Sequence, residues 1–410
     1  MVKGAPSEGW AAQRATPRSL RLLVRALFVV LIGILILGAT IPSVVWQATN
    51  VRGVFGDQLI WNDDESVMFA SARGGIIAAS PQGASLVRRA VVSHQFLGGS
   101  IGYGDGWLYF VSDGSYFMAL DVSDLGAIVP HGPFRLGEAI GDFVKVYKIL
   151  VRDGIALLGG YSPFPTDRGV IVALNVSDPA SITIDPSTLH VLYWLYFDAG
   201  VADIAIQGSS MYVIRGGGHL DVFDLTVSPP EFQTTYLLGG ALAGLDVQGD
   251  LLAVTDGDMA NKTVLFYQVS GSQISFLSRA VLAGQPTVVS LESNRAYVSW
   301  HPDDNFDRGL AVFDLQDVRA PRLVYRLATR DFGGNSHLVS RGTAYLLGLD
   351  DTTIVREAAV PSIFVDSLPQ TILVALAAVE GVLLVLYWVK GRATTRQRQR
   401  TDWPPSVERR

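Results

Sequence analysis

The phrase YFMALDVSDLGAI at residues 116–128 returns as VIVALNVSDPASI at residues 170–182. Both copies alternate apolar and polar positions and then pass into a short polar segment, a pattern typical of a β-strand that ends in a turn. The centre of the phrase recurs along the chain as LDVS (120–123), LNVS (174–177), FDLT (223–226), YQVS (267–270) and FDLQ (313–316). The residues at the second position of these copies can all form hydrogen bonds, but they are not all charged. We therefore expect them to cap the following turn and not to act in catalysis.

A tight polar turn and a strand precede each copy, and an apolar residue, usually a large one, lies at a fixed offset from that turn. The aligned turns place seven residues in one column: Phe69, Tyr109, Leu157, Tyr212, Ala253, Tyr297 and Tyr345. Their spacing of 40 to 55 residues matches a four-stranded propeller blade. The sequence thus predicts an all-β fold over residues 48–360, a seven-bladed β-propeller of four-stranded antiparallel blades, with no helix between residues 47 and 362.

The strands of each predicted blade are lettered A to D from the central channel outward. In the last blade, residues 343–349 and 352–358 are predicted as strands B and C, and no strand D follows them. We expect residues 48–55 to supply that strand and close the ring. Both chain ends then leave from the surface of the A–B turns and C–D connections, named the C–D face. The opposite surface is the B–C face.

Three segments resemble the LVIVD repeat, a propeller-blade motif of bacterial and archaeal surface proteins: FMALDVSDLGAIV (117–129), VIVALNVSDPASI (170–182) and LAVFDLQDVRAPRLV (310–324). The resemblance covers most of residues 57–358, good in five blades and poor in the first and the last. It implies a propeller and a surface location, but no shared reaction. The blades are also similar to those of quinoprotein-type propellers, but the tryptophan-docking pattern of those proteins is missing.

Two apolar segments flank the predicted propeller and are expected to be transmembrane helices. Residues 26–46 carry no charge and, at about 1.5 Å per residue, are long enough to span a bilayer. A cleaved signal peptide is the alternative, but its apolar part is usually only about 7–15 residues long. The second helix is expected at residues 366–389.

Basic residues lie at the outer ends of both segments: Arg14, Arg18, Arg21 and Arg25 before the first, and Lys390, Arg392, Arg396, Arg398 and Arg400 after the second. The positive-inside rule places the basic tails, residues 1–25 and 390–410, in the cytoplasm, and the second tail is expected to be disordered. We therefore expect a two-pass protein of the plasma membrane, in contact with the lipid bilayer, with its propeller outside the cytoplasm.

The net charge of −6 divides unevenly, because the two tails carry +4 and +5, which leaves −15 for the rest of the chain. An acidic body does not attract nucleic acid, so we exclude a nucleic-acid partner. The absence of cysteine excludes disulfides, zinc–thiolate sites and iron–sulfur clusters.

The loops predicted for the B–C face are acidic, with Asp113, Asp256, Asp258, Asp303, Asp304, Asp307, Asp350 and Asp351. They form either a binding surface or, the reading we favour, a solvated rim that keeps the protein soluble. Within this set, Asp303, Asn305 and Asp307 have the alternate spacing of a calcium loop. A polar hairpin loop is the alternative we favour, and no other cofactor is predicted.

Glu380 lies near the middle of the second apolar segment, where an ionised carboxylate is costly. Ala377 and Gly381 make a small-residue face beside it, which favours close packing against another helix. Three interpretations remain open for Glu380: a neutral carboxyl bonded to a backbone carbonyl, a contact with a partner helix or a second copy, and a proton relay.

These patterns contain no catalytic constellation, and we expect no enzyme. The function we infer is a membrane-anchored extracytoplasmic propeller that serves as a binding or assembly platform. In one version it is an accessory subunit of a larger membrane complex, recruited through the second transmembrane helix. The alternative is a propeller enzyme, a hydrolase or a quinoprotein-like oxidoreductase, with its site at the channel mouth.

Overall fold

The computed structural model describes residues 43–52, 58–72, 75–82, 85–93, 99–112, 115–141, 144–163, 168–182, 191–258, 260–301, 308–329, 337–347 and 351–360. By its contacts the chain divides into one unit at Trp46–Glu357 and a second made of Met1–Val45 and Ala358–Arg410. Both expected tails and the second expected span lie outside the described residues, as do residues 26–42 of the first span. The account below concerns the first unit.

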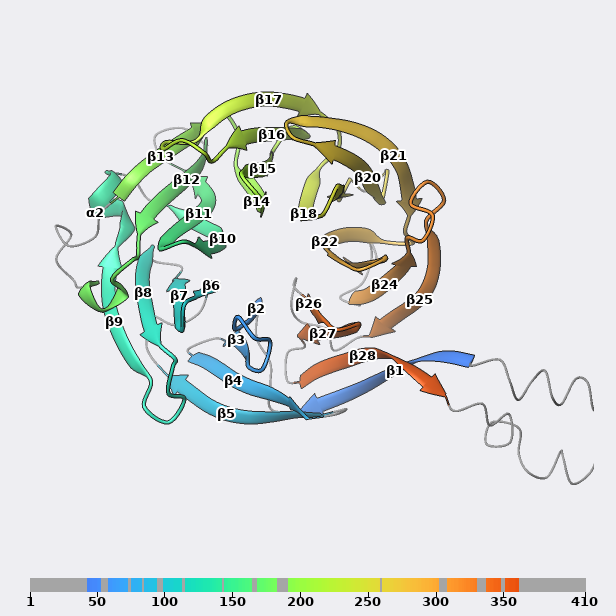
Figure 1. Ribbon diagram of the computed structural model, residues 1–410, viewed down its shortest axis with the longest axis horizontal. Coiled ribbons are helices and arrows are strands. Elements are labelled where there is room, and N and C mark those ends of the chain that lie inside the picture. Colours follow the sequence, from blue (N-terminus) through green and yellow to red (C-terminus); the bar gives the residue numbers. More distant parts are fainter. Residues whose placement is uncertain are drawn as a thin grey trace, which may run out of the picture. The chain divides into compact units, whose positions relative to one another are not determined.

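Seven four-stranded sheets form this unit, arranged in a ring around a central axis (Figure 1). Blades 1 to 3 contain β2 (Gln58–Trp61), β3 (Met68–Ala72), β4 (Gly75–Gln82) and β5 (Ser85–Ser93); β6 (Ser100–Gly104), β7 (Trp107–Val111), β8 (Tyr116–Asp121) and β9 (Val129–Arg135); and β10 (Lys145–Arg152), β11 (Ile155–Ser162), β12 (Arg168–Asn175) and β13 (Val191–Phe197). Blades 4 and 5 contain β14 (Val201–Gln207), β15 (Ser210–Arg215), β16 (His219–Asp224) and β17 (Glu231–Leu237); and β18 (Leu242–Gln248), β19 (Leu251–Asp256), β20 (Thr263–Ser270) and β21 (Gln273–Val281). Blades 6 and 7 contain β22 (Gln285–Glu292), β23 (Arg295–His301), β24 (Arg308–Asp314) and β25 (Arg322–Thr329); and β26 (His337–Ser340), β27 (Thr343–Leu347), β28 (Asp351–Val360) and β1 (Ser43–Arg52). The predicted seven-bladed propeller of four-stranded blades is confirmed.

The residues of the predicted column all lie in strand B of their blades, and all seven are buried. In some blades the partner in strand C is complementary in size. Tyr109 lies opposite Ala119, whereas Ala253, the smallest residue of the column, lies opposite Phe266. In these two blades a large residue in one strand is matched by a small residue in the other, which suits close packing of the core.

The ring closes as predicted, because β1 lies beside β28 and supplies strand D of the seventh blade, but this strand is Ser43–Arg52 and begins five residues before the expected residue 48. The first transmembrane helix was expected at residues 26–46, and its C-terminal end is wrong. Ser43–Trp46 belong to strand β1 and not to a helix. The sequence SVVW, rich in β-branched and aromatic residues, suits an outer strand as well as a membrane span. No helix within the described residues is long and apolar enough to cross a membrane.

Two short helical turns correct the expectation of a purely stranded body. Helix α2 (Leu136–Ile140) follows β9, and the 3₁₀ turn η1 (Pro179–Ser181) follows β12. Leu136 is fully buried and packs into the core between blades 2 and 3. A single helical turn is too short to produce a periodic pattern in the sequence, which explains why it was missed.

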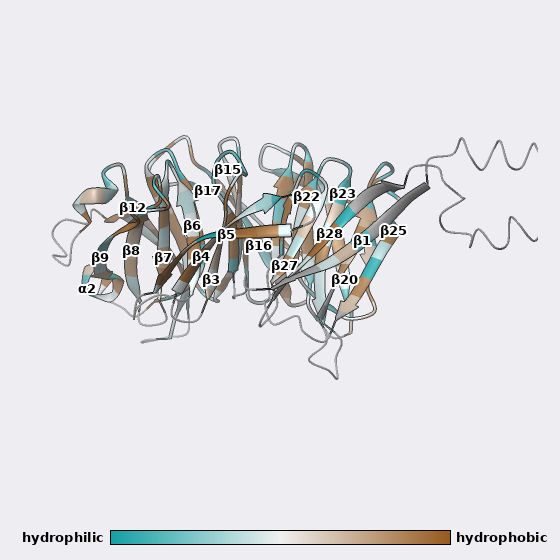
Figure 2. Cartoon of the chain, turned by 90° about the horizontal axis from the view of Figure 1, so that it is seen from below, coloured by the Kyte–Doolittle hydropathy of each residue, from teal (hydrophilic) through white to brown (hydrophobic). Residues whose placement is uncertain are grey.

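The connections between strands gather at the two faces of the unit, with the apolar strand segments between them (Figure 2). Because neighbouring strands in a blade are antiparallel, every strand C, including β28, runs toward the C–D face. Figure 1 shows β1 running opposite to β28, so β1 begins where β28 ends. The first and last described residues of the chain therefore lie on the C–D side.

Candidate functional site

The capping role predicted for the repeated phrase is confirmed at four positions. A side-chain oxygen accepts a hydrogen bond from the backbone N–H two residues later, over 2.8 to 3.0 Å, in Asp121, Asn175, Asp224 and Asp314. Hydrogen bonds from Ser123 hold the pKa of Asp121 below its ordinary value, and Thr226 does the same for Asp224. These carboxylates shape turns and stay ionised, so they are unsuited to proton transfer.

The acidic B–C face is less open than the sequence suggested. Asp256 is only 4% exposed, and its Oδ1 accepts hydrogen bonds from the N–H groups of Ala241 and Asp258, each over 3.0 Å. Its Oδ2 accepts a further bond from Asn261 Nδ2 over 3.0 Å. The expectation that Asp256 belongs to an exposed acidic surface is therefore wrong, because its carboxylate is buried and accepts hydrogen bonds from the loop that follows it and from the connection before β18.

Asp258 is partly exposed and accepts a hydrogen bond from the N–H of Ala260 over 3.0 Å. Asp351 is the first residue of β28. The other predicted site residues lie outside the described part of the chain: Asp113, Asp303, Asp304, Asn305, Asp307, Asp350, Ala377, Glu380 and Gly381. Among the described residues, no group of three His, Asp or Glu side chains is placed to hold a metal ion.

Polar side chains of the innermost strands join neighbouring blades around the channel. Ser100 in β6 donates from Oγ to the carbonyl of Val146 in β10 over 2.8 Å. Asp203 in β14 accepts at Oδ2 from the N–H of Leu245 in β18 over 3.1 Å. Each bond crosses from one blade to the next, so these residues stabilise the ring and are not free for a ligand.

A charged pair also joins the innermost strands of blades 3 and 4. Lys148 Nζ is 3.1 Å from Asp203 Oδ1, and this carboxylate is the main cause of a raised pKa at Lys148. Burial raises the pKa of nearby Asp246 to about 6. A lysine held protonated cannot act as a base, and both oxygens of Asp246 accept hydrogen bonds from backbone N–H groups, of Val247 and Leu291.

Blades 6 and 7 meet at a serine–histidine pair, with Ser299 Oγ 2.6 Å from His337 Nδ1. The two residues are 1% and 4% exposed, and burial lowers the pKa of His337 to about 4. The pair has the contact of a nucleophile and its base, but no substrate reaches side chains covered to this extent. Its role is to hold two blades together.

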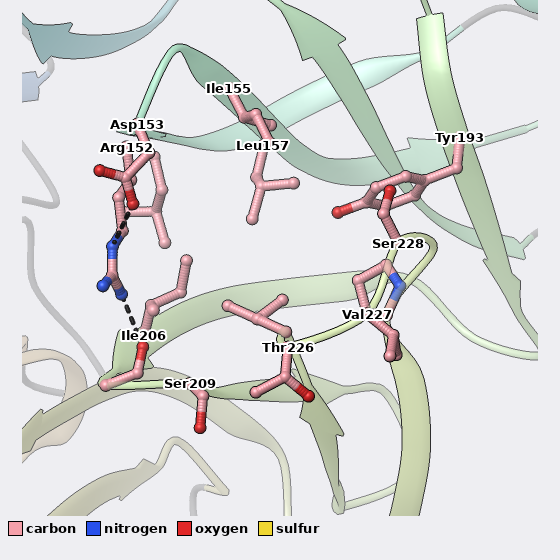
Figure 3. A pocket seen from close by; sticks show the side chains of 14 residues that line it. Arg152, Asp153, Ile155, Leu157, Tyr193, Ile206, Ser209, Thr226, Val227 and Ser228 are labelled. Atoms are coloured by element: carbon pink, nitrogen blue, oxygen red, sulfur yellow. Dashed lines mark hydrogen bonds and ion pairs between the residues drawn. The ribbon is translucent and has the colours of Figure 1, made fainter.

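A recess of about 380 Å³ lies between blades 3 and 4, on the C–D face. Figure 3 shows its lining, which comes from two A–B turns, the C–D connection of blade 4 and strand D of blade 3. The lining residues are Leu150, Arg152, Asp153, Ile155, Leu157, Tyr193, Ile206, Gly208, Ser209, Leu225, Thr226, Val227, Ser228 and Pro230. The volume and the mostly apolar lining are those of a binding pocket for a small group.

The polar groups of the recess limit what it accepts. Arg152 donates from Nη1 to the carbonyl of Gly208 over 2.6 Å and from Nε to Asp153 Oδ2 over 3.1 Å, so its charge is already paired. Tyr193 extends toward the recess in Figure 3, and burial raises its pKa to about 12, so its hydroxyl stays protonated. The recess therefore suits an uncharged apolar group. Sequence reasoning missed it because the lining residues come from separated parts of two blades.

No family model matches the sequence, and no curated protein matches it either. Two solved structures are similar to it in fold. The β-propeller domain of Myceliophteria thermophila Cps50 (Swd1) gives a TM-score of 0.54 at 12% identity, covering 76% of this chain and 98% of that chain. A chain of the Mitotic Checkpoint Complex gives a TM-score of 0.56 at 13% identity, covering 78% and 96%. At these identities the likeness shows the β-propeller fold alone.

Proposed function

We propose that this chain is a membrane-anchored β-propeller that acts outside the cytoplasm as a binding platform for a membrane protein partner. The observation that carries the proposal is the position of the recess between blades 3 and 4. It opens on the C–D face, the same face from which β28 and β1 lead to the two apolar segments. A recess on that side is offered to membrane-proximal parts of a partner, and its apolar lining fits an apolar side chain of such a segment.

Membrane anchoring rests on the sequence. With Ser43–Trp46 in a strand, residues 26–42 still give seventeen uncharged residues, or about 26 Å of helix, at the lower limit for a span. Residues 366–389 supply the second span, and the arginines outside both spans support cytoplasmic tails. The resemblance of the strand C phrases to LVIVD repeats points to the same surface location.

The second span adds a second route to a partner. Glu380 lies at membrane depth beside the small residues Ala377 and Gly381, and such a carboxyl is expected to face protein rather than lipid. A partner held by this span and by the recess makes the chain an accessory subunit of a larger membrane complex.

Two matched variants test the recess. Val227 is 48% exposed and lies on the recess in a connection, whereas Leu237 is 72% exposed at the opposite end of the same blade. Val227→Asp puts a charge into the recess, and Leu237→Asp puts the same charge on the B–C side. We expect a membrane protein that co-purifies with the wild-type chain in mild detergent to be lost from Val227→Asp and retained by Leu237→Asp.

Equal recovery with both variants would rule out the recess as the binding site. Glu380→Leu separates the two routes, because it changes the second span and leaves the propeller intact. Retention of the partner by Glu380→Leu but not by Val227→Asp would assign binding to the recess alone.

A further inference from the structure

Strand β13 differs from the other outer strands in having no charge and no proline; its sequence is VLYWLYF. The other six strands D contain such residues: Arg88 and Arg89 in β5, Pro130, Pro133 and Arg135 in β9, Glu231 in β17, Arg279 in β21, Arg322 and Arg326 in β25, and Arg52 in β1. Charges and prolines on an edge strand prevent it from pairing with another chain. This protection is missing in blade 3.

One side of β13 is open to solvent. Leu192, Trp194 and Tyr196 are 44%, 46% and 39% exposed, and the Arg168 guanidinium of β12 stacks on the Tyr196 ring, 3.6 Å from its centroid. Tyr193 and Leu195 on the other side pack against blade 4. The sheet order is β10-β11-β12-β13, so within the described residues no strand pairs with the outer edge of β13. The strand therefore offers both an apolar side and an unused row of backbone groups.

The packing of blade 3 does not require a tryptophan at position 194. Trp194 lies opposite Val172 in β12, and the residues at the same register in blades 5 and 6 are Arg279 and Arg326. The repeat thus carries arginine at this place without loss of the blade. An exposed tryptophan in an uncharged edge strand instead marks a contact surface.

We propose that β13 pairs with β13 of a second copy of this chain, in antiparallel register centred on Trp194. The apolar pattern of the strand reads the same in both directions, so the strand is complementary to itself. Trp194 then lies opposite Trp194 of the second copy, and Leu192 lies opposite Tyr196 of the second copy. Aromatic and aliphatic pairs of this kind stabilise antiparallel strands, and the backbone adds the hydrogen bonds of a continuous sheet.

The position of the strand in the ring permits this pairing. Figure 1 shows β13 running along the circumference of the ring, so its free edge faces radially outward. The two-fold axis of an antiparallel pair is perpendicular to the local sheet and hence nearly parallel to the axis of the ring. Two rings then lie side by side with the same face on the same side, which is compatible with anchoring in one membrane.

The register is tested with single cysteines, because the chain contains none of its own. In the full chain, solubilised in mild detergent and oxidised with a copper catalyst, Trp194→Cys is expected to form a disulfide-linked dimer. Leu192→Cys and Tyr196→Cys are each expected to stay monomeric alone and to cross-link when mixed. Dimers from either single variant, or none from Trp194→Cys, would contradict the proposed register.

The interface itself is tested by Trp194→Arg, which places at blade 3 the residue that blades 5 and 6 already carry. Light scattering after gel filtration is expected to give a dimer for the wild-type chain and a roughly 100-fold weaker dimer for Trp194→Arg, with an unchanged melting temperature. Leu237→Arg, at a more exposed place in β17, is the control and should remain dimeric. A monomeric wild-type chain, including one bound to a different protein through β13, would overturn the proposal. So would a Trp194→Arg dimer as tight as the wild type, which is the result if copies associate only through Glu380.

Discussion

Asp246 in strand A of blade 5 accepts a hydrogen bond from the backbone N–H of Leu291 in strand A of blade 6, with 2.6 Å between Oδ2 and the nitrogen. Its Oδ1 accepts a second bond from the N–H of Val247 over 2.8 Å. Gln58 makes the equivalent contact between blades 1 and 2, where Oε1 accepts from the N–H of Ile101 over 3.0 Å. Side chains thus join the innermost strands across blade boundaries, where no β-ladder connects the sheets.

The pKa of Asp246 predicts a pH dependence of stability. Burial raises this pKa from 3.8 to about 6, so the folded chain binds the proton more tightly than the unfolded chain. The contribution of Asp246 to the free energy of unfolding therefore falls as the pH rises from about 4 to about 6. Asp246→Asn removes this term. In urea unfolding of the full chain at several pH values, the stability of the variant relative to the wild type should increase across that range, and a constant difference would contradict the assignment.

His337 predicts the opposite slope over a similar range. Burial lowers its pKa from 6.5 to about 4, so the folded chain keeps the ring neutral where the unfolded chain is protonated. The wild-type chain therefore loses stability as the pH falls from about 6.5 to about 4. His337→Gln lacks this loss, so its stability relative to the wild type should decrease as the pH rises through the same range. Thermal melting in a pH series checks the sign, and a relative stability that rises with pH would contradict it.

Asp256, the last residue of β19, and Asp258, in the loop that follows, should differ strongly in their contribution to stability. Asp256→Ala leaves two backbone N–H groups and the Asn261 amide without their acceptor, so we expect a loss of about 2–4 kcal/mol. Asp258→Ala leaves only the N–H of Ala260, which is exposed, and should cost about 1 kcal/mol or less. Denaturant unfolding of both variants measures the difference. Equal losses of stability would contradict the buried position of Asp256 and would favour the solvated acidic surface that the sequence suggested.

The same carboxylate makes neighbouring glycines unequal. Gly239 and Gly240 both have positive φ, +77° and +74°, so alanine is strained at either position. A Cβ at Gly239 meets nothing within 4 Å, whereas one at Gly240 lies 2.2 Å from Asp256 Oδ1. We expect Gly239→Ala to cost about 1 kcal/mol and Gly240→Ala about 3 kcal/mol or more. Comparable melting temperatures for the two variants would show that Asp256 is not held as described.

The repeat made most of the fold predictable. The strand C phrase and the strand B column each recur in register with the backbone, so the number of blades, the strand order and the closure by the N-terminal strand could all be inferred. The irregularities could not. In five blades the pairing of strands C and D shifts register at equivalent places, such as Ala173/Leu174 in blade 3, and in blade 2 it shifts slightly earlier, between Phe117 and Ala119. A bulge adds one residue without changing the composition of the strand, so it leaves no mark in the pattern.

The candidate site was predicted less well, for physical reasons. Acidic residues suggested an open surface, but the burial of Asp256 depends on donors from Ala241 and Asn261 that the spacing of acids does not show. The recess arises from the fit of blade 3 against blade 4, and packing between repeats cannot be read from one repeat. Tyr193 carried a visible signal, since VLYWLYF is the one outer strand without a charge.

The central claim, a propeller held outside the cytoplasm by two spans, is tested most directly by labelling single cysteines in intact cells. The chain has no cysteine, so each variant carries one reactive thiol. Gln233→Cys lies at an exposed position in β17, and Ser406→Cys lies in the C-terminal tail. We predict that a membrane-impermeant maleimide labels Gln233→Cys in intact cells and Ser406→Cys only after the cells are opened. Protection of Gln233→Cys until lysis, or recovery of the chain in the soluble fraction, would contradict the account.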